Sequence, residues 1–335
     1  MRILLVKLSS LGDVVHTLPV VHDILAAMPQ AQIDWVVEKP FAPLLTCIGG
    51  IHRVIPCELR RWRKSFWTQP TRMAWHAFKT DLQQDAYDAV IDLQGLTKSA
   101  VMARLARLTP GGKRYAMANQ TEGSAYEAPT RWLAHVAIEI KPHVHAVQRG
   151  RELAARALGY SVSAPAVYAL KPSPAQLKQA QAAPETIAFI HGTSRPDKTW
   201  PTENWIELTK RLQGCGCQVA LIHGSAQELA TSQAIAQATG AAVWPLMPLD
   251  ALTQQLGQCA GAIGVDSGVS HIAVALDLPH VQIYNFDTAW RTGPGSDPAG
   301  LGRHQASVYA QPSPSVEAVW QAWLHCRAGC EGRSP

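Results

Sequence analysis

Short apolar runs alternate along the chain with longer stretches in which apolar residues recur at helical spacing. Short runs bounded by polar residues are typical of strands buried in a parallel sheet. Their alternation with helical stretches predicts helices on both faces of each sheet. The pattern therefore predicts an α/β fold with two doubly wound, Rossmann-like sheets. The expected strands include residues 3–6, 33–37, 53–55 and 87–92 in the first half, and 186–191, 218–222, 241–244, 261–265 and 280–284 in the second.

A proline-rich stretch divides the two halves. Four prolines fall between residues 165 and 184, as is typical of a connection between domains. In open α/β sheets ligands bind at the carboxyl ends of the strands, so we expect the two domains to face one cleft. We predict an N-terminal domain at 1–165, a linker at 166–185, a C-terminal domain at 186–310 and a closing helix at 311–327. This helix is expected to pack back towards the N-terminal domain, with a disordered tail after Cys326.

Composition narrows the class of protein. The 335 residues are 47% hydrophobic, enough for two cores, and no apolar run approaches the length of a membrane span. The first residues carry no secretory cleavage site, so we expect a cytoplasmic protein. Seven cysteines show no metal-site spacing, and Cys215-Gly216-Cys217 is one residue too tight for a zinc knuckle. Free thiols and no structural metal are expected.

The loop after the first apolar run carries a candidate catalytic group. Ser9, Ser10 and Gly12 interrupt the pattern, and Asp13 lies where the next helix begins. Acidic residues are common in the first turn of a helix because they cap free N–H groups there. Asp13 on its own is therefore better explained as a cap than as a catalytic carboxylate.

Three loops in the second half each follow a strand and offer groups that could hold a nucleotide. Hydroxyls, an ammonium and the free N–H groups at a helix start favour phosphate oxygens, and an acid beginning a helix could accept ribose hydroxyls. Turn formation and capping are the better explanations of the first two loops taken alone, whereas the third loop is moderately specific for a diphosphate. No dinucleotide fingerprint or P-loop occurs. The candidates are Thr193, Ser194 and Lys198; then Glu228; then Asp266, Ser267, Gly268 and His271.

A basic, aromatic run lies in the first half. It contains Arg60, Arg61, Arg63 and Lys64, interleaved with Trp62, Phe66 and Trp67. On a helix, Trp62 and Phe66 would share a face. Such a segment suits an anionic membrane surface or a phosphorylated lipid, and would also suit nucleic acid. A solvated helix with its aromatic side chains packed inward is an equally good interpretation. Gln94, after the fourth strand, adds a polar group at the edge of the expected cleft.

Taken together, these motifs resemble the lipopolysaccharide heptosyltransferases. The matching segments run in order over nearly the whole chain, and the opening favours the type I branch over type II. A departure follows Gln120-Thr121, where many members carry an arginine and this chain has Glu122-Gly123-Ser124. The segments are Lys7–Pro19, Arg60–Lys64, Val90–Gly95, Asp197–Pro201 and Asp266–His271.

The resemblance implies a GT-B glycosyltransferase that acts at the cytoplasmic face of the inner membrane, in peripheral contact with its anionic surface. It implies transfer of L-glycero-D-manno-heptose from ADP-heptose to the Kdo residue of Kdo-lipid A, with inversion and with no metal, cofactor or nucleic acid. By the same resemblance Asp13 is the general base. Thr193, Ser194 and Lys198 hold the diphosphate, Glu228 the ribose, Met247 the adenine and Asp266 the heptose, while Ser267, Gly268 and His271 complete the donor site. The acceptor side comprises Ser10, Gly12, Gln94, Arg60, Arg61, Arg63 and Lys64.

Three alternatives stay open. A type II or III heptosyltransferase would differ only in using a heptosylated acceptor. A non-catalytic nucleotide-binding protein could use the basic segment to dock on a membrane surface. A hydrolase or epimerase of nucleotide-sugars could share the fold. The absence of the glycine fingerprint disfavours a dehydrogenase.

Overall fold

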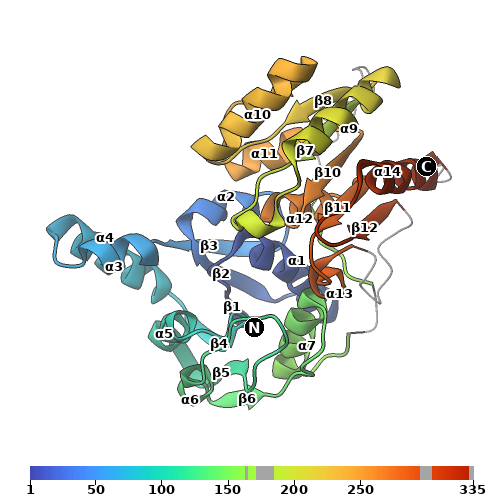
Figure 1. The fold of residues 1–335 in the computed structure, drawn as a ribbon. Coiled ribbons are helices and arrows are strands. Elements are labelled where there is room, and N and C mark those ends of the chain that lie inside the picture. The colour runs from blue at the N-terminus through green and yellow to red at the C-terminus, as the bar shows by residue number, and fades with distance from the viewer. Residues whose placement is uncertain (163–164, 171–184, 295–303, 332–335) are drawn as a thin grey trace. The chain divides into compact units, whose positions relative to one another are not determined.

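The computed structural model describes residues 1–162, 165–170, 185–294 and 304–331, and the chain divides into two compact units (Figure 1). Unit 1 is Met1–Ala169 and unit 2 is Leu170–Pro335. Each contains a six-stranded sheet, in the order β3-β2-β1-β4-β5-β6 and β12-β11-β10-β7-β8-β9, and every pairing is parallel. Counted within its own unit, each sheet has the strand order 3-2-1-4-5-6 of a dinucleotide-binding fold. The predicted doubly wound α/β fold is confirmed.

Unit 1 alternates strands with helices from its first residue. Its strands are β1 Arg2–Val6, β2 Gln32–Glu38, β3 Ile51–Cys57, β4 Ala86–Asp92, β5 Arg107–Met117 and β6 Val136–Ile138. Its helices are α1 Leu11–Ala27, η1 Lys39–Phe41, α2 Ala42–Leu45, α3 Leu59–Ser65, α4 Gln69–Leu82, α5 Thr97–Leu105, α6 Pro129–Leu133 and α7 Ala146–Leu158.

Unit 2 repeats the alternation. Its strands are β7 Thr186–Ile190, β8 Gln218–Leu221, β9 Ala242–Val243, β10 Gly261–Val265, β11 His280–Tyr284 and β12 Gln305–Tyr309. Its helices are η2 Pro196–Lys198, α9 Thr202–Gly214, α10 Ala226–Thr239, α11 Leu249–Leu256, α12 Gly268–Ala275, α13 Ala289–Thr292 and α14 Val316–Glu331. In the described residues of both units, no helix has the length and apolar character that a membrane span requires.

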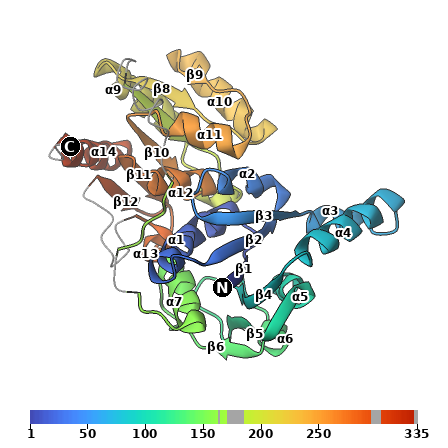
Figure 2. The same ribbon diagram turned by 180° about the vertical axis from the view of Figure 1, so that it is seen from behind.

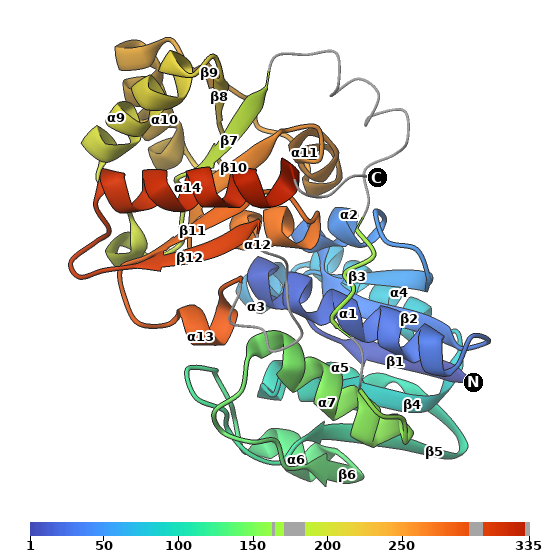
Figure 3. The same ribbon diagram turned by 90° about the vertical axis from the view of Figure 1, so that its right-hand side faces the viewer.

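Both sheets are buried on their two faces, as parallel sheets require. In unit 1, successive residues of β1 point to opposite faces and are all fully buried from Ile3 to Val6. One face packs against α3, α4 and α5 through Trp62, Phe78 and Met102. Helices α1 and α7 lie side by side on unit 1, as Figure 3 shows. The central strands are therefore rigid supports for the loops that follow them.

The last helix differs from its prediction at its C-terminal end. It continues through residue 331, so the residues just after Cys326 are helical rather than disordered. Its apolar face belongs to the core of unit 2, with Val319, Trp323 and Cys326 buried there, and Figure 3 shows it crossing that sheet. Trp323 lies so close to Gly261 that a Cβ there would meet its ring at 2.5 Å. The apolar face of this helix is therefore covered within unit 2, and its packing towards the N-terminal domain stays a prediction.

Other boundaries also differ from the sequence pattern. Helix α5 ends at Leu105, and β5, which was not among the expected strands, begins at Arg107. The strand expected at 53–55 extends over Ile51–Cys57. Most of the predicted linker, residues 171–184, lies outside the described residues.

Candidate functional site

In unit 1, polar groups gather where β1 ends and α1 begins. Asp13 is the third residue of α1. Its Oδ2 accepts hydrogen bonds from the Ser10 backbone N–H at 3.1 Å and the Ser10 hydroxyl at 3.0 Å. The carboxylate therefore caps its own helix, as the sequence suggested for this residue alone. Capping uses only one of its two oxygens.

The other oxygen of Asp13 faces two cations. Lys7 Nζ lies 3.4 Å from Oδ1 and Arg149 lies 3.6 Å from it. Burial alone would raise the pKa of Asp13, but these two charges and the Ser10 hydrogen bonds outweigh it and lower that pKa to about 2. The side chain is still 38% exposed. Asp13 is thus an ionised, accessible carboxylate at the carboxyl edge of the sheet.

Lys7 links this group to a buried acid on the neighbouring strand. Its ammonium is buried and donates to the Leu93 carbonyl oxygen at 3.1 Å; burial lowers the pKa of Lys7, against the pull of Asp13. Asp92, at the end of β4, accepts hydrogen bonds from Gln94 N–H and from the Ser99 hydroxyl, both at 3.0 Å. Burial nevertheless raises the pKa of Asp92 to about 6. Two carboxylates near one lysine therefore have very different proton affinities.

Gln94 supports the loop before α1. Its side-chain oxygen accepts from the backbone N–H of Leu8 at 2.7 Å and of Ser9 at 3.3 Å. The Ser9 hydroxyl accepts from Lys98 Nζ at 3.1 Å. Because Gln94 is buried and holds the backbone, it positions the loop that carries the accessible candidates Ser10 and Gly12.

The basic run occupies α3, and its aromatic residues separate. Trp62 is buried against Trp75 and Phe78, with ring centroids 5.3 and 5.1 Å away. Phe66 is 47% exposed, so the expectation that Trp62 and Phe66 share a face is wrong: α3 ends at Ser65, before Phe66. The four cations are exposed: Arg60, Arg61, Arg63 and Lys64.

In unit 2, Asp266 is the centre of a second polar group, at the end of β10. It pairs with the Lys198 ammonium through Oδ2, and its Oδ1 lies 3.5 Å from His271 Nε2. Burial favours the neutral acid, but His271 and Lys198 outweigh it and hold the pKa of Asp266 well below its usual range. The structure therefore brings a predicted phosphate ligand, Lys198, onto a predicted sugar ligand, Asp266.

The start of α12 adjoins this pair. Ser267 caps the helix, accepting from the Ser270 N–H at 3.5 Å, and Gly268 is its first residue. Thr193 donates its hydroxyl hydrogen to the Asp266 carbonyl oxygen at 3.4 Å. The N–H groups and positive dipole end of a helix attract anions. A diphosphate near Lys198 would therefore meet a helix start as well as an ammonium.

Glu228 lies in the first turn of α10 and makes separate contacts. Its Oε2 accepts the Gly224 backbone N–H at 2.6 Å, and its own N–H bonds to the Ser225 hydroxyl at 3.2 Å. Its carboxylate also lies against Gly192, where an added Cβ would meet Cδ at 2.4 Å. The capping role is realised, and the carboxylate stays half-buried beside two glycines. Ser194 is exposed, and Met247 is half-buried between β9 and α11.

Sequence reasoning missed three residues that support these groups. Arg149 reaches Asp13 from α7 and also donates to the Thr121 hydroxyl at 3.0 Å. Arg149 thus brings a cation to the segment around Thr121, where the sequence alone showed none. Gln282 donates to Asp266 Oδ1 at 3.4 Å, and Asn285 donates to the Asp197 and Thr199 carbonyl oxygens at 3.0 and 2.9 Å. No motif marks them, because each is brought in by strand order or helix packing.

Metal ligands do not cluster in the described residues: no three His, Cys, Asp or Glu side chains there are grouped to hold an ion. The polar groups instead combine cations with single carboxylates. Such a set suits a ligand with a diphosphate and hydroxyls.

Two Rossmann-type units of equal strand order, with anion-binding groups and an accessible carboxylate at the strand ends, define a GT-B glycosyltransferase. The model of glycosyltransferase family 9 (heptosyltransferase) matches residues 75–317. Lipopolysaccharide heptosyltransferase 1 of Escherichia coli K12 is 37% identical over 335 residues, covering 97% of this chain and 98% of that protein. The Pseudomonas aeruginosa protein of the same name is 38% identical, covering 88% and 81%. The chain therefore belongs to the family 9 heptosyltransferases.

A solved structure agrees with this assignment. E. coli heptosyltransferase WaaC with ADP superposes with a TM-score of 0.81 at 34% identity, covering 96% of this chain and 98% of that one. By contrast, a heptosyltransferase 2 from Salmonella typhimurium is 26% identical over 90% of this chain and 88% of that protein. The predicted family is confirmed, and the higher identity lies with type 1 proteins.

Proposed function

We propose that this enzyme transfers L-glycero-D-manno-heptose from ADP-heptose to the Kdo residue of Kdo-lipid A, in the synthesis of the lipopolysaccharide inner core. The observation that carries the proposal is the Lys198–Asp266 pair beside the start of α12. It offers a cation and a helix start to a diphosphate and a carboxylate to sugar hydroxyls. The similarity to WaaC, whose structure contains ADP, supports this donor class.

The chemistry needs one base and a stabilised leaving group. The oxygen of the acceptor hydroxyl bonds to the anomeric carbon from the face opposite the diphosphate, and Asp13 takes the proton of that hydroxyl. The bond from that carbon to the diphosphate oxygen breaks, and its electron pair leaves with ADP. Because the attack comes from the opposite face, the configuration inverts. Lys198 and the start of α12 stabilise the leaving anion, so the proposed reaction uses no metal or cofactor.

The other residues of unit 2 are assigned to parts of ADP-heptose by their positions at the strand ends and helix starts. Glu228 binds the ribose hydroxyls, with Met247 beside the adenine. Thr193, Ser194 and Ser267 offer hydroxyls to the diphosphate, Gly268 allows close approach to the backbone, and His271 keeps Asp266 ionised.

The acceptor is anionic, carrying carboxylate and phosphate groups, so the cations of unit 1 fit it. Lys7 and Arg149 lie beside Asp13, and Ser10, Gly12 and Gln94 form or support the adjoining loop. Arg60, Arg61, Arg63 and Lys64 on α3 add an exposed positive surface. An acceptor anchored in lipid places the enzyme at the cytoplasmic face of the inner membrane, in peripheral contact with anionic headgroups.

Mass spectrometry of products tests the proposal. The purified enzyme is incubated with ADP-heptose and either Kdo-lipid A, heptosylated Kdo-lipid A or no acceptor. Addition of one heptose to Kdo-lipid A alone supports the proposed reaction. Transfer only to the heptosylated acceptor would indicate a type II or III enzyme. Heptose release or isomerisation without acceptor would indicate a hydrolase or epimerase, and ADP binding without turnover a non-catalytic protein.

A further inference from the structure

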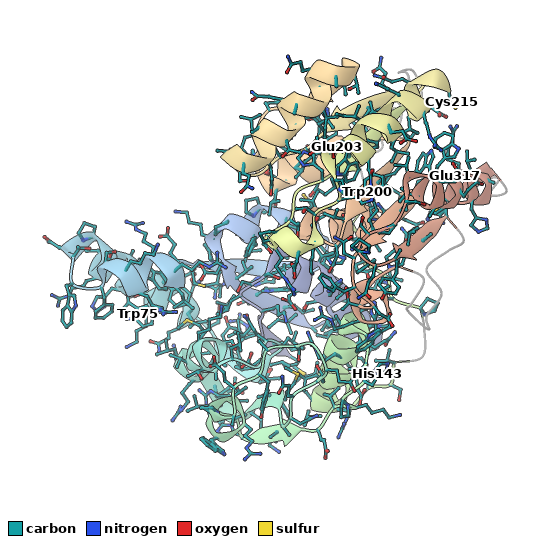
Figure 4. All side chains as sticks on the ribbon, in the orientation of Figure 1. Trp75, His143, Trp200, Glu203, Cys215 and Glu317 are labelled. Atoms are coloured by element: carbon teal, nitrogen blue, oxygen red, sulfur yellow. The ribbon has the colours of Figure 1, made fainter. Side chains whose placement is uncertain are left out.

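Helices α3 and α4 form a hairpin that extends away from the sheet of unit 1 (Figures 1 and 2). Its base is packed into the core by Trp62, Phe78 and Leu82. Trp75, labelled on α4 in Figure 4, packs partly buried against the same cluster. The base is therefore a firm support, and the far end of the hairpin is free to meet a partner.

The tip of the hairpin exposes large apolar side chains. Trp67 is 91% exposed, Met73 65% and Phe66 47%. The Phe66 and Trp67 rings stack edge to face with their centroids 6.0 Å apart. Most apolar side chains of this size are buried in folded proteins, and a tryptophan this exposed contributes nothing to the core.

Hydrogen bonds fix the turn that carries these rings. The Thr68 hydroxyl donates to the Ser65 carbonyl oxygen at 2.8 Å and to the Thr71 hydroxyl at 3.0 Å. The Ser65 and Thr71 hydroxyls lie 2.8 Å apart. The turn holds Trp67 outward, so little conformational entropy is lost when the ring enters an apolar environment.

From residue 59 to residue 80, the charged side chains of the hairpin are all basic. Residues 59–80 contain Arg60, Arg61, Arg63, Lys64, Arg72 and Lys79, and no aspartate or glutamate. These six charges exceed the net charge of the whole chain, +5. Among the residues that the structure describes, Arg61 is the one basic residue of α3 that forms an ion pair, with Glu58 at 3.2 Å. Exposed aromatic and apolar residues framed by cations are complementary to an anionic bilayer interface.

We propose that the α3–α4 tip inserts Phe66, Trp67 and Met73 into an anionic phospholipid monolayer, with Arg63, Lys64 and Arg72 on the headgroups. The inference deepens the membrane contact of the proposed function and rests on it for the choice of membrane. Tryptophan favours this boundary because its ring is apolar and its N–H is polar. The tip thus supplies a membrane anchor that needs no acceptor lipid.

The experiment compares two exposed tryptophans of unit 1. Trp132 on α6 is 69% exposed, with Arg131 over its ring at 5.6 Å, and it lies near the opposite edge of the sheet. Full-length wild type, Trp67→Ala and Trp132→Ala are sedimented with phosphatidylglycerol–phosphatidylethanolamine vesicles that contain no lipopolysaccharide. We expect Trp67→Ala to lower the partition coefficient about tenfold and Trp132→Ala to change it less than twofold. Both variants should fold normally, because neither indole is buried.

Fluorescence locates the ring. Lipids brominated on the acyl chain quench an indole that reaches the hydrocarbon, so wild type and Trp132→Ala should be quenched and Trp67→Ala much less. Equal vesicle binding by all three proteins would overturn the proposal. So would tighter, Trp67-dependent binding to a single-stranded oligonucleotide, or a Trp67-dependent dimer in sedimentation.

A second measurement separates this inference from the enzymatic one. Trp67→Ala should retain wild-type kcat and KM with a deacylated, water-soluble acceptor. Trp67-dependent vesicle binding without heptose transfer would leave the anchor standing and refute the proposed reaction. Transfer to the soluble acceptor with no vesicle binding would support the proposed reaction and refute the membrane anchor.

Discussion

Gly192 lies directly against the Glu228 carboxylate, which makes Gly192→Ala a sharp perturbation of the donor site. An added Cβ would stand 2.4 Å from Glu228 Cδ and 2.7 Å from each carboxylate oxygen. Ordinary contact begins at 3.4 Å, so the carboxylate must move by about 1 Å (3.4 − 2.4). The far end of a flexible glutamate moves easily. The substitution should therefore displace a ligand-binding group without disturbing the fold.

The expected magnitude follows from the bonds that the carboxylate makes. Moving it breaks or lengthens the 2.6 Å bond from Gly224 N–H and misplaces the acceptor for the ribose hydroxyls. Hydrogen bonds to a charged group contribute about 1.5–3 kcal/mol, which corresponds to a rise of about tenfold to a hundredfold in the KM for ADP-heptose. The free energy of unfolding should fall by roughly 0.5–2.6 kcal/mol, because loss of the Gly224 bond costs about 1.5–3 kcal/mol and the restriction that alanine places on the unfolded chain offsets about 0.4–1 kcal/mol of it.

The assay is steady-state transfer with varied ADP-heptose at saturating acceptor, together with urea unfolding. The matched control is Gly214→Ala at the end of α9, where an added Cβ meets nothing within 4 Å; its KM should equal that of wild type. Glu228→Gln and the double variant Gly192→Ala/Glu228→Gln complete a double-mutant cycle. If both substitutions act through one carboxylate, their effects on KM should be strongly non-additive.

Two results would refute the reasoning at different points. A raised KM in Glu228→Gln with an unchanged KM in Gly192→Ala would mean that the carboxylate does not have to move. An unchanged KM in both variants would mean that Glu228 does not bind the donor.

Three further outcomes are expected. Asp13→Asn should lose about 10²–10⁴-fold in kcat while keeping its circular dichroism, and near-normal turnover would exclude a general base at this position. Lys198→Ala should lower kcat/KM for ADP-heptose while leaving the KM for the acceptor unchanged; an unchanged kcat/KM would contradict its phosphate role. Asp92, whose pKa is raised to about 6 by burial, binds its proton more tightly in the folded state. Protonation of Asp92 should therefore contribute up to about 3 kcal/mol to the free energy of unfolding as pH falls from about 6 to about 4, against the opposite contribution of His191 and His280, whose pKa values burial lowers. Asp92→Asn should remove the Asp92 contribution, and a pH profile parallel to that of wild type would refute the buried titration.

The sequence revealed most clearly the strands that burial makes continuously apolar. β1, β4, β7 and β10 lie in the middle of their sheets and were recognised for that reason. β5 was missed because Gly111, Gly112, Lys113 and Arg114 interrupt its pattern. β6 and β12 are edge strands, and an edge strand needs fewer apolar residues because one side lacks a neighbour. A pattern that measures burial therefore detects the central strands reliably and the edges unevenly, since the edge strands β3 and β9 were predicted and β6 and β12 were not.

The same limit applied to the site. Ser10 and Asp13 are three residues apart, so their contact follows from helix geometry, and a capping role for Asp13 was expected. Gln282 reaches Asp266 because β11 pairs with β10, with Gly264 opposite Gln282. That register depends on which strands are neighbours in the sheet, and the sequence pattern does not predict the strand order. Arg149 reaches Asp13 because α7 packs on α1, where a Cβ added at Gly150 would stand in ordinary contact with a Val20 methyl carbon, at 3.6 Å. Local motifs located the carboxylates, and tertiary packing supplied the partners that set their charge.

Those partners bear on the order of events at the anomeric carbon. With a pKa of about 2, Asp13 is ionised at any working pH but is a weak acceptor for the proton of an alcohol. Its proton affinity suffices once the acceptor oxygen has begun to bond to carbon, because that oxygen is then strongly acidic. In the proposed reaction we therefore expect proton transfer to Asp13 to be late and to follow departure of the diphosphate, in keeping with an oxocarbenium-like transition state. On this argument Lys198 and the start of α12 lower the main barrier, whereas Lys7 and Arg149 keep Asp13 charged and oriented to trap the proton.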